Sequence, residues 1–376
     1  MIFRYTRAKP KIYKPFCNWI EEEEEEEEEE MLCAYISCWA WTGQSPVIRA
    51  PNSEPKLSIS RTAPPALGGR CDRGESSSME LPVPAQVKPI TSTSNPFVKH
   101  CLKLRLSSSY RHSHGSAVVV GTTPIREIYR YKESKQEPPA TIDCLLLLDK
   151  AEIPDGLEDL PIRTIRVGSM VMKKLSGLQS TESIETICIM KIPSTFYNLD
   201  DNWQEADCQG WFPSLHRILV LDGIQDPGNL GTLLRSAMAF RWGGVFLLPG
   251  CCDPFNEKAL RASRGASFQL PIVSGSWAHL EALANQFGLK ILAGHPESSE
   301  LSKQPVCRLS QRLADSLANL PLCLVLGSEG GGLSEKARQV SELVSIPMAG
   351  EFESLNVSVA GGIFLYMLQP EDQRLL

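Results

Sequence analysis

The chain has 376 residues, of which 38 are basic and 44 acidic, so its formal net charge is −6. This length allows two or three domains with buried cores, and 42% apolar and 22% charged residues are typical of a soluble globular protein. A negative net charge would argue against a nucleic-acid partner. However, residues 1–30 hold ten acidic and five basic side chains, a net of −5, which leaves only −1 for the rest of the chain. The net charge therefore does not exclude a nucleic-acid partner.

Membrane, metal and disulfide classes are excluded more firmly. No apolar run approaches the roughly 18 residues of a membrane-spanning helix. The 12 cysteines contain no C-x-x-C pair, and the six histidines are not paired at ligand spacing. We therefore expect free thiols, no metal site and no membrane partner.

Residues 1–88 do not have the pattern of a folded domain. The ten glutamates at 21–30 repel one another and cannot be buried, and the following segment is rich in proline and serine. From Met31 onward the serines and arginines resemble an organelle transit peptide. We expect a disordered leader and an organellar location, in a plastid more than in a mitochondrion. A plain disordered tail is the alternative.

Residues 89–197 predict a small α/β domain. The spacing of apolar residues indicates a helix over 94–106, with Pro96 at its first position. Short apolar runs at 117–121, 144–149 and 184–193 indicate strands.

This first domain is locally basic. From Lys88 to Lys135 there are nine basic and two acidic residues, a net charge of +7. Such a concentration favours contact with the phosphates of RNA, although a solvated helix face would show the same charge. The candidate RNA-binding residues are Lys99, Lys103, Arg105, Arg111 and Arg126.

A polar segment, 198–215, is expected to link this domain to a second one over 216–376. There, strands and helices alternate, which is typical of a mostly parallel sheet covered by helices. The expected strands are 217–224, 244–250, 290–294, 322–327 and 342–347, and the expected helices are 229–240, 277–288, 335–340 and 354–368.

Three glycine-containing loops, at 226–231, 327–334 and 346–360, each follow an apolar strand and open a helix. Parallel sheets bind ligands at such places. None of the loops is G-x-G-x-x-G, and the chain has neither a Walker A sequence nor a G-x-S-x-G elbow. A dehydrogenase, a P-loop nucleotidase and a serine hydrolase are therefore disfavoured.

The segments DPGNLGTLLRSAMAF (226–240), LVLGSEGGGLS (324–334) and IPMAGEFESLNVSVAGGI (346–363) resemble the three signature motifs of the SpoU (TrmH-like) family. These are RNA ribose 2′-O-methyltransferases of the SPOUT superfamily. The resemblance covers about 216–370. Residues 91–197 resemble, more weakly, the ribosomal-protein-like substrate-binding domain of part of this family. The resemblance implies a trefoil-knotted sheet, S-adenosylmethionine as cofactor and a homodimer formed through the last helix.

The resemblance also assigns residues. It implies catalytic or site-ordering roles for Arg235, Asn229, Glu329, Ser354 and Asn356, and cofactor contacts for Leu326, Gly327, Gly331, Ile346, Met348 and Leu355. Asn229, Ser354 and Asn356 could alternatively be helix caps, and Glu329 a turn residue. Arg235 lies about 140° from the apolar stripe of its helix. Its guanidinium has an ordinary pKa above about 12, so holding a phosphate and orienting the hydroxyl suits it better than general-base chemistry.

Two local features accompany the motifs. Arg241 stands where the family commonly has glycine. Gly361 and Gly362 inside the last helix each cost roughly 1 kcal/mol relative to alanine, which a close helix-to-helix approach would explain.

We therefore expect an enzyme that methylates a ribose 2′-hydroxyl in structured RNA, and we expect ribosomal RNA because the extra basic domain suits a large substrate. A tRNA ribose methyltransferase is one alternative. A catalytically silent RNA-binding factor in ribosome assembly is another, which the intact Asn229, Arg235 and Glu329 argue against.

Overall fold

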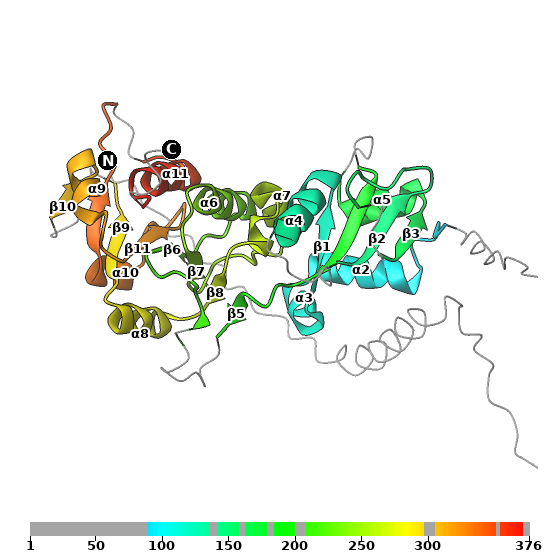
Figure 1. Cartoon of the computed structure of the whole chain (residues 1–376), viewed down its shortest axis with the longest axis horizontal. Helices are drawn as coiled ribbons and strands as arrows, with labels where there is room; N and C mark the ends of the chain where they lie inside the picture. The colour runs from blue at the N-terminus through cyan, green and yellow to red at the C-terminus, as the bar shows by residue number, and fades with distance from the viewer. Residues whose placement is uncertain are drawn as a thin grey trace, which may run out of the picture. The chain divides into compact units, whose positions relative to one another are not determined.

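The computed structural model describes residues 89–134, 142–157, 162–178, 184–199, 208, 210–296, 305–350 and 354–370, and the expected leader over 1–88 lies outside these ranges. The described residues form a four-stranded and an eight-stranded sheet with their helices (Figure 1). None of the helices in these ranges is long and apolar enough to cross a membrane. Their cysteines are all free thiols.

The smaller sheet has the order β1-β4-β2-β3. Its strands are β1 (Ser116–Val120), β2 (Ile142–Leu148), β3 (Thr164–Val167) and β4 (Thr186–Lys191). β4 is antiparallel to β1 and β2, whereas β2 and β3 are parallel. The accompanying helices are α2 (Pro96–Leu106), α3 (Ser108–His114), α4 (Thr122–Ser134) and α5 (Ser169–Ser176). The helix and three strands predicted in this part of the chain are confirmed.

The larger sheet has the order β10-β12-β9-β11-β6-β7-β8-β5. Its strands are β5 (Phe196–Asn198), β6 (Arg217–Asp222), β7 (Gly244–Leu247), β8 (Ile272–Ser274), β9 (Lys290–Gly294), β10 (Val306–Arg308), β11 (Leu322–Gly327) and β12 (Glu342–Ser345). Every neighbouring pair among these described strands is parallel, as the alternating pattern predicts.

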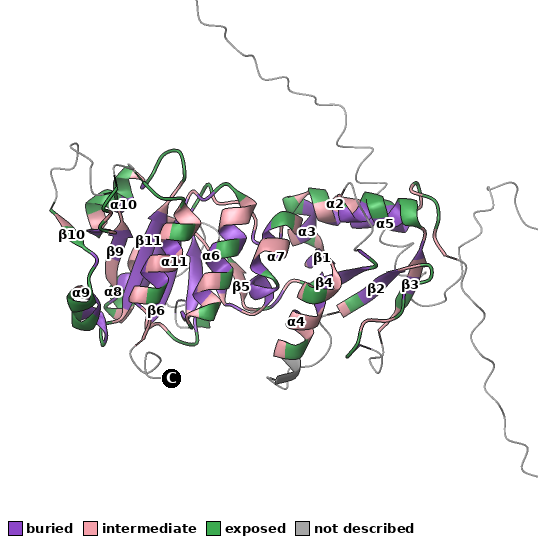
Figure 2. Cartoon of the chain, turned by 90° about the horizontal axis from the view of Figure 1, so that it is seen from above, coloured by how far each residue is buried: buried purple, intermediate pink, exposed green. Residues whose placement is uncertain are grey.

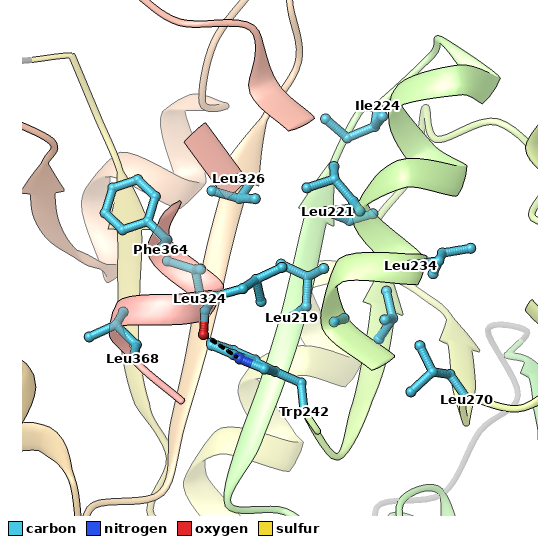
Figure 3. Close-up of a cluster of buried hydrophobic side chains, with 14 of the residues drawn as sticks. Leu219, Leu221, Ile224, Leu234, Trp242, Leu270, Leu324, Leu326, Phe364 and Leu368 are labelled. Carbon is cyan, nitrogen blue, oxygen red and sulfur yellow. Dashed lines mark hydrogen bonds between the residues drawn. The ribbon is translucent and has the colours of Figure 1, made fainter. Parts of the chain in front are cut away.

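Helices cover both faces of this sheet, because alternate residues of its strands are buried on opposite sides. Leu219 and Leu221 of β6 pack in one cluster with side chains of α6 (Pro227–Ala239), α9 (Gln311–Leu317) and α11 (Val357–Met367). Ile218 and Val220 pack in another with side chains of α8 (Trp277–Phe287) and α10 (Glu335–Val340). Figure 2 shows the buried strands beneath helices that are exposed on their outer sides, and Figure 3 shows the first cluster. α7 (Glu257–Ser263) and a short 3₁₀ helix (Ala266–Phe268) precede β8.

The two glycines of α11 have different surroundings. A Cβ on Gly361 would overlap Leu233 of α6 and lie 2.9 Å from Cδ1 of Leu326, whereas one on Gly362 would meet no atom within 4 Å. The close approach expected from this pair therefore occurs inside the chain, at Gly361. Trp242 also contacts α11, because its indole N–H donates to the carbonyl of Leu365 at 3.1 Å (Figure 3).

A buried cation lies at the amino-terminal end of β6, whereas the glycine loops follow the carboxyl ends of the strands. The guanidinium of Arg217, at the first position of β6, is 1% exposed. It donates to the carbonyl of Leu368 at 2.7 Å, beyond the end of α11, and to that of Leu320 at 2.6 Å. It also reaches Leu317 and Ala318 at the end of α9, at 3.0 and 2.9 Å. The ends of helices carry unpaired carbonyls with partial negative charge, which suits a buried guanidinium.

The expected boundary between the domains needs correction. Phe196 to Asn198, placed at the end of the first domain and the start of the linker, form β5 and pair with β8 of the larger sheet. Farther along the expected linker, Trp211 and Phe212 are buried in the cluster beneath α8. The polar residues and Pro213 predicted a linker. However, burial of two adjacent aromatic side chains contributes more favourable free energy than ordering this segment costs.

Candidate active site

A cavity of about 580 Å³ opens at the carboxyl ends of three neighbouring strands, β9, β11 and β12. This volume falls in the range of small-molecule sites. All six residues predicted to contact a cofactor line it, together with three of the five predicted catalytic residues. These lining residues are Leu326, Gly327, Gly331, Ile346, Met348 and Leu355, with Glu329, Ser354 and Asn356.

The loop after β11 forms one wall through a tight turn. The backbone N–H groups of Ser328 and Gly332 each donate to the other's carbonyl at 3.0 Å, and the Ser328 hydroxyl accepts from the N–H of Gly331 at 3.1 Å. Gly332 has φ +64°, and a Cβ on Gly327 would overlap the backbone of Gly332. Glycine is therefore favoured at Gly332 by its left-handed backbone, and at Gly327 because a Cβ there would force the turn apart.

This loop is attached to β6 by a buried carboxylate. Asp222, the last residue of β6, is 8% exposed and accepts the backbone N–H of Ser334 at 2.8 Å. The contact fixes the end of the loop where α10 begins. The loop therefore has both ends anchored on neighbouring parallel strands, β11 and β6.

The third loop enters α11 through an asparagine cap. The Asn356 side-chain oxygen accepts from the N–H groups of Ser358 and Val359, at 2.9 and 3.4 Å, so Asn356 is the N-cap. Ser354 caps nothing and lies exposed in the cavity lining. On α6 the N-cap is Asp226, whose carboxylate accepts from the N–H of Asn229 at 2.8 Å. The alternative of helix capping thus holds for Asn356 but not for Asn229 or Ser354.

The three motifs meet in a row of side-chain hydrogen bonds. Asn356 donates its amide to the Asn229 carbonyl oxygen at 3.2 Å, and Asn229 donates its amide to the Glu329 carboxylate at 2.6 Å. The second bond has a charged acceptor, so it is the stronger of the two. Residues 100 and 127 positions apart in the sequence are thereby joined beside the cavity.

Arg235 is not brought into this cavity. It lies exposed on α6, six residues and about 9 Å of helix beyond Asn229. There it lines a separate hollow with residues of α4. The structure therefore joins Asn229, Glu329 and Asn356 and leaves Arg235 apart from them.

Four of the five predicted RNA-binding residues are exposed or half-buried, and the fifth, Arg111, is buried. Lys99 is exposed, Arg126 is half-buried on α4, and the Lys103 ammonium lies 5.5 Å from the ring centre of Tyr110. Arg105 donates to the carbonyls of Lys174 and Leu175 at the end of α5, which occupies part of its guanidinium.

Arg111 is a correction. Its guanidinium is 2% exposed and donates to one carboxylate oxygen of Asp253 at 2.6 and 2.9 Å, and to the carbonyls of Leu104 and Arg105 at 2.8 Å. The prediction rested on a count of local charges. Such a count does not include Asp253, a carboxylate 142 residues away that neutralises the Arg111 guanidinium. Arg111 joins the two folded parts and has no surface for RNA.

Asp253 is the centre of that contact. Burial opposes its ionisation, but hydrogen bonding with His112, the charge of Arg111 and the Ser108 hydroxyl outweigh burial and hold the pKa of Asp253 well below its usual range. The ring of His112 also stacks on Phe196, 5.3 Å between centres.

The sequence reading missed several lining residues. Gly294 and His295 at the end of β9, Arg338 of α10 and Phe364 of α11 all line the cavity. Arg338 donates to the carbonyl of Leu333 at 2.6 Å, so it also supports the loop after β11. These four lie outside the motif loops, and only the parallel order of the strands could have indicated them.

One departure from the family pattern has a backbone explanation. Arg241, which stands where the family commonly has glycine, has φ +53°. Glycine adopts this left-handed conformation without strain, whereas a residue with a Cβ does so at a cost.

An all-parallel sheet covered on both faces, with a ligand-sized cavity formed by glycine loops at its carboxyl edge, defines a ligand-binding α/β domain. Comparison with known proteins is more specific. Residues 216–366 match the model of the SpoU rRNA Methylase family. An uncharacterized tRNA/rRNA methyltransferase of Mycobacterium avium is 36% identical over 263 residues, which are 68% of this chain and 77% of the relative. The chain belongs to the SpoU family.

Two further similarities extend over both folded parts. The 23S rRNA (guanosine(2553)-2′-O)-methyltransferase RlmP of Bacillus subtilis is 25% identical over 284 residues, 75% of this chain and 100% of the relative. The crystal structure of an AdoMet-bound rRNA methyltransferase from Sinorhizobium meliloti superposes with a TM-score of 0.58 at 24% identity, over 77% of this chain and 98% of that one. This second likeness confirms the fold.

Proposed function

We propose that this chain transfers the methyl group of S-adenosylmethionine to the 2′-oxygen of a ribose in ribosomal RNA. Membership of the SpoU family makes it an RNA methyltransferase that uses this cofactor. The observation that carries the proposal is the cavity lined by the second and third motif loops, to which Asn229 of the first motif is joined through the row Asn356–Asn229–Glu329.

The cavity suits the cofactor chemically. Leu326, Ile346, Met348 and Leu355 give apolar walls for an adenine, and the loop after β11 offers backbone groups through its glycines. Bound there, S-adenosylmethionine supplies a methyl group made electrophilic by its sulfonium. Glu329 in the same lining provides a negative charge that favours a cationic ligand.

The roles of the chain's own residues follow from their positions. Asn229 and Asn356 hold Glu329 and the third loop in register, which positions the substrate hydroxyl for an in-line approach. Ser354 lies exposed in the lining and does not cap a helix. Its hydroxyl can therefore donate a hydrogen bond to the substrate hydroxyl or accept one from it. Arg235 clamps a phosphate of the RNA, because a guanidinium matches two phosphate oxygens and stays charged.

Ribosomal RNA is favoured over tRNA by two observations. The first folded part presents exposed or half-buried bases at Lys99, Lys103 and Arg126 next to the catalytic part. The relative from Bacillus subtilis, named for 23S rRNA, aligns over both parts of the chain. A tRNA substrate is the alternative.

We also propose a homodimer through α11, with the knotted threading that the family resemblance implies. Along α11 and the residue preceding its cap, Leu355, Val359 and Tyr366 are 38%, 53% and 57% exposed, and Gly362 leaves an open surface among them. A second copy would cover this apolar strip and give Gly362 the close helix contact that it lacks within the chain.

Methyl transfer by an Arg235→Ala variant tests the catalytic assignment. With tritiated S-adenosylmethionine and total RNA from cells lacking the protein, we expect methyl transfer to be lost and cofactor affinity to stay within a few-fold. Arg312→Ala, an exposed arginine on α9, is the matched control. Equal transfer by the two variants would refute the role of Arg235. Mapping 2′-O-methyl sites in the same RNA distinguishes ribosomal RNA from tRNA.

The composition of residues 31–88 supports a further proposal, an organellar and preferentially plastid location. Fusion of residues 1–88 to a fluorescent protein tests it: import into plastids is expected, and a diffuse cytosolic signal would contradict it.

A further inference from the structure

A second hollow, which we name the arginine hollow, lies between α4 and the catalytic part and has a volume of about 400 Å³. Residues from three places line it, α4, α6 and the segment 263–269. They are Glu127, Arg130, Arg235, Met238, Ala239, Ser263, Arg264, Ala266 and Gln269. It shares no lining residue with the cavity at the carboxyl ends of β9, β11 and β12.

The arginine hollow has an excess of positive charge. Three guanidinium groups line it, against the single carboxylate of Glu127. Glu127 pairs with Arg264, with 2.7 Å between Oε1 and Nη2. Among the residues that the structure describes, neither Arg130 nor Arg235 has an ion pair. Within the described part of the chain, two cations from different parts therefore line one space without an ion-paired carboxylate of their own.

The backbone holds Arg264 in place at some cost. Arg264 closes α7 with φ +50°, a left-handed conformation that is uncommon for a residue with a Cβ. Gly265 follows with φ +92°, and a Cβ there would lie 2.7 Å from Cγ1 of Ile128 on α4. Strained residues of this kind concentrate at ligand sites, and here the turn directs a guanidinium toward α4.

We propose that the arginine hollow binds a phosphodiester of the RNA substrate, held between Arg130 and Arg235. This inference rests on the proposed function and adds to it: Arg130 and Arg264 become substrate-binding residues, and α4 joins the path of the RNA. The phosphate competes with Glu127 for Arg264, so RNA binding loosens that ion pair and replaces it with a phosphate contact. One RNA segment is thereby held by both folded parts of the chain.

The side chains that line the hollow favour a phosphate as its ligand. Guanidinium groups form forked hydrogen bonds to phosphate oxygens, and three of them converge here. Apart from the arginines, the polar lining side chains are Gln269 and Ser263, whose hydroxyl donates to the carbonyl of Leu260 at 3.2 Å. Phosphate contacts carry no sequence information, so the arginines of the hollow should contribute affinity and register.

The salt dependence of RNA affinity measures such a contact. The probe is in vitro transcribed 23S rRNA with the full-length protein, and the variants are Arg130→Ala, Arg264→Ala and the control Arg312→Ala. Loss of one phosphate contact lowers the slope of log affinity against log salt by about 0.7 to 0.9. We expect this change for Arg130→Ala, with affinity reduced about fivefold to tenfold near physiological salt, and no change for Arg312→Ala.

A fourth variant, Glu127→Gln, separates phosphate binding from a structural role. If the hollow binds phosphate, Glu127→Gln frees Arg264 and removes a repelling charge, so RNA affinity should rise, by about threefold, while Arg264→Ala lowers it. If the ion pair only holds the two parts together, both variants break it and both lower RNA affinity. Effects of the same sign would therefore overturn the proposal, as would an unchanged slope in Arg130→Ala, which is exposed and carries little risk of misfolding.

The two proposals fail in different ways. If the intact protein binds and methylates RNA but Arg130→Ala keeps its salt slope, only the arginine hollow is refuted. If the intact protein neither methylates RNA nor binds it in a salt-dependent manner, the proposed function fails and this inference with it. Binding of S-adenosylmethionine, measured for each variant, should stay at the wild-type level.

Discussion

Asn229 is the residue through which α6 contacts both other motif loops, so changing Asn229 to aspartate tests how the site is held together. The substitution keeps the shape of the side chain. It replaces the amide that donates to Glu329 with a carboxylate oxygen, and it leaves an oxygen to accept from Asn356.

The magnitude follows from the 2.6 Å distance between the Asn229 amide nitrogen and Glu329 Oε1. A hydrogen bond to a charged acceptor is worth about 1.5 to 3 kcal/mol. Two unit charges at this distance would repel by about 1.6 kcal/mol even at the dielectric constant of water. Because the exposed side chains can rotate apart, we expect roughly 1.4 to 2.8 kcal/mol to remain, a tenfold to hundredfold loss of cofactor affinity.

A second substitution should restore the contact. In the double variant Asn229→Asp with Glu329→Gln, the new amide at 329 donates to the new carboxylate at 229, so the bond returns with its polarity reversed. Titration calorimetry with S-adenosylmethionine, followed by single-turnover methyl transfer, gives affinity and rate for all four proteins. Recovery of affinity without rate would show that the Glu329 charge itself acts in catalysis. If the double variant binds the cofactor no better than Asn229→Asp, the ordering role argued for this row is refuted.

Three further outcomes are expected. Gly327→Ala should abolish cofactor binding in calorimetry, because its Cβ would overlap a backbone turn, whereas Gly330→Ala, with open space around its Cβ, should bind normally; equal binding by the two would contradict the argument. Asp253→Ala should lower the free energy of unfolding in urea by about 3 to 5 kcal/mol, since it leaves the Arg111 guanidinium buried and unpaired, and a change below 1 kcal/mol would show that water compensates it. Burial and the nearby positive groups lower the pKa of His100 to about 4, so between pH 6.5 and 4 only the unfolded chain takes up this proton and stability falls with pH, by about 3 kcal/mol in all. Urea denaturation at pH 7 and 4.5 should show a smaller loss for His100→Gln, and identical losses would place the titration elsewhere.

Short-range patterns predicted the elements that contain their own signals. Pro96 marked the start of α2, and the segments predicted over 322–327 and 335–340 agree with the observed bounds of β11 and α10. The six residues predicted to contact the cofactor line one cavity for a related reason. Glycine loops directly after buried strands meet at one edge whenever the strands are parallel and adjacent.

What the sequence could not supply depended on contacts between distant residues. Arg111 and Lys99 look alike in a charge count, yet one is paired with Asp253 and the other is exposed. Arg235 carries the motif but faces α4, because the six positions that separate it from Asn229 rotate it away from the cavity mouth. The burial of Trp211 in an otherwise polar segment likewise depends on α8, which comes much later in the chain.

The guanidinium of Arg217 has a consequence for how the catalytic part opens. It closes the ends of α9 and α11 onto the first residue of β6, so neither helix can detach without leaving a buried charge and several carbonyls unpaired. The fraying that helix ends ordinarily show should be suppressed there. In hydrogen exchange, the amides of α11 should therefore open only together with those of the central strand β6, and the helix that carries the Asn356 cap should stay docked between turnovers.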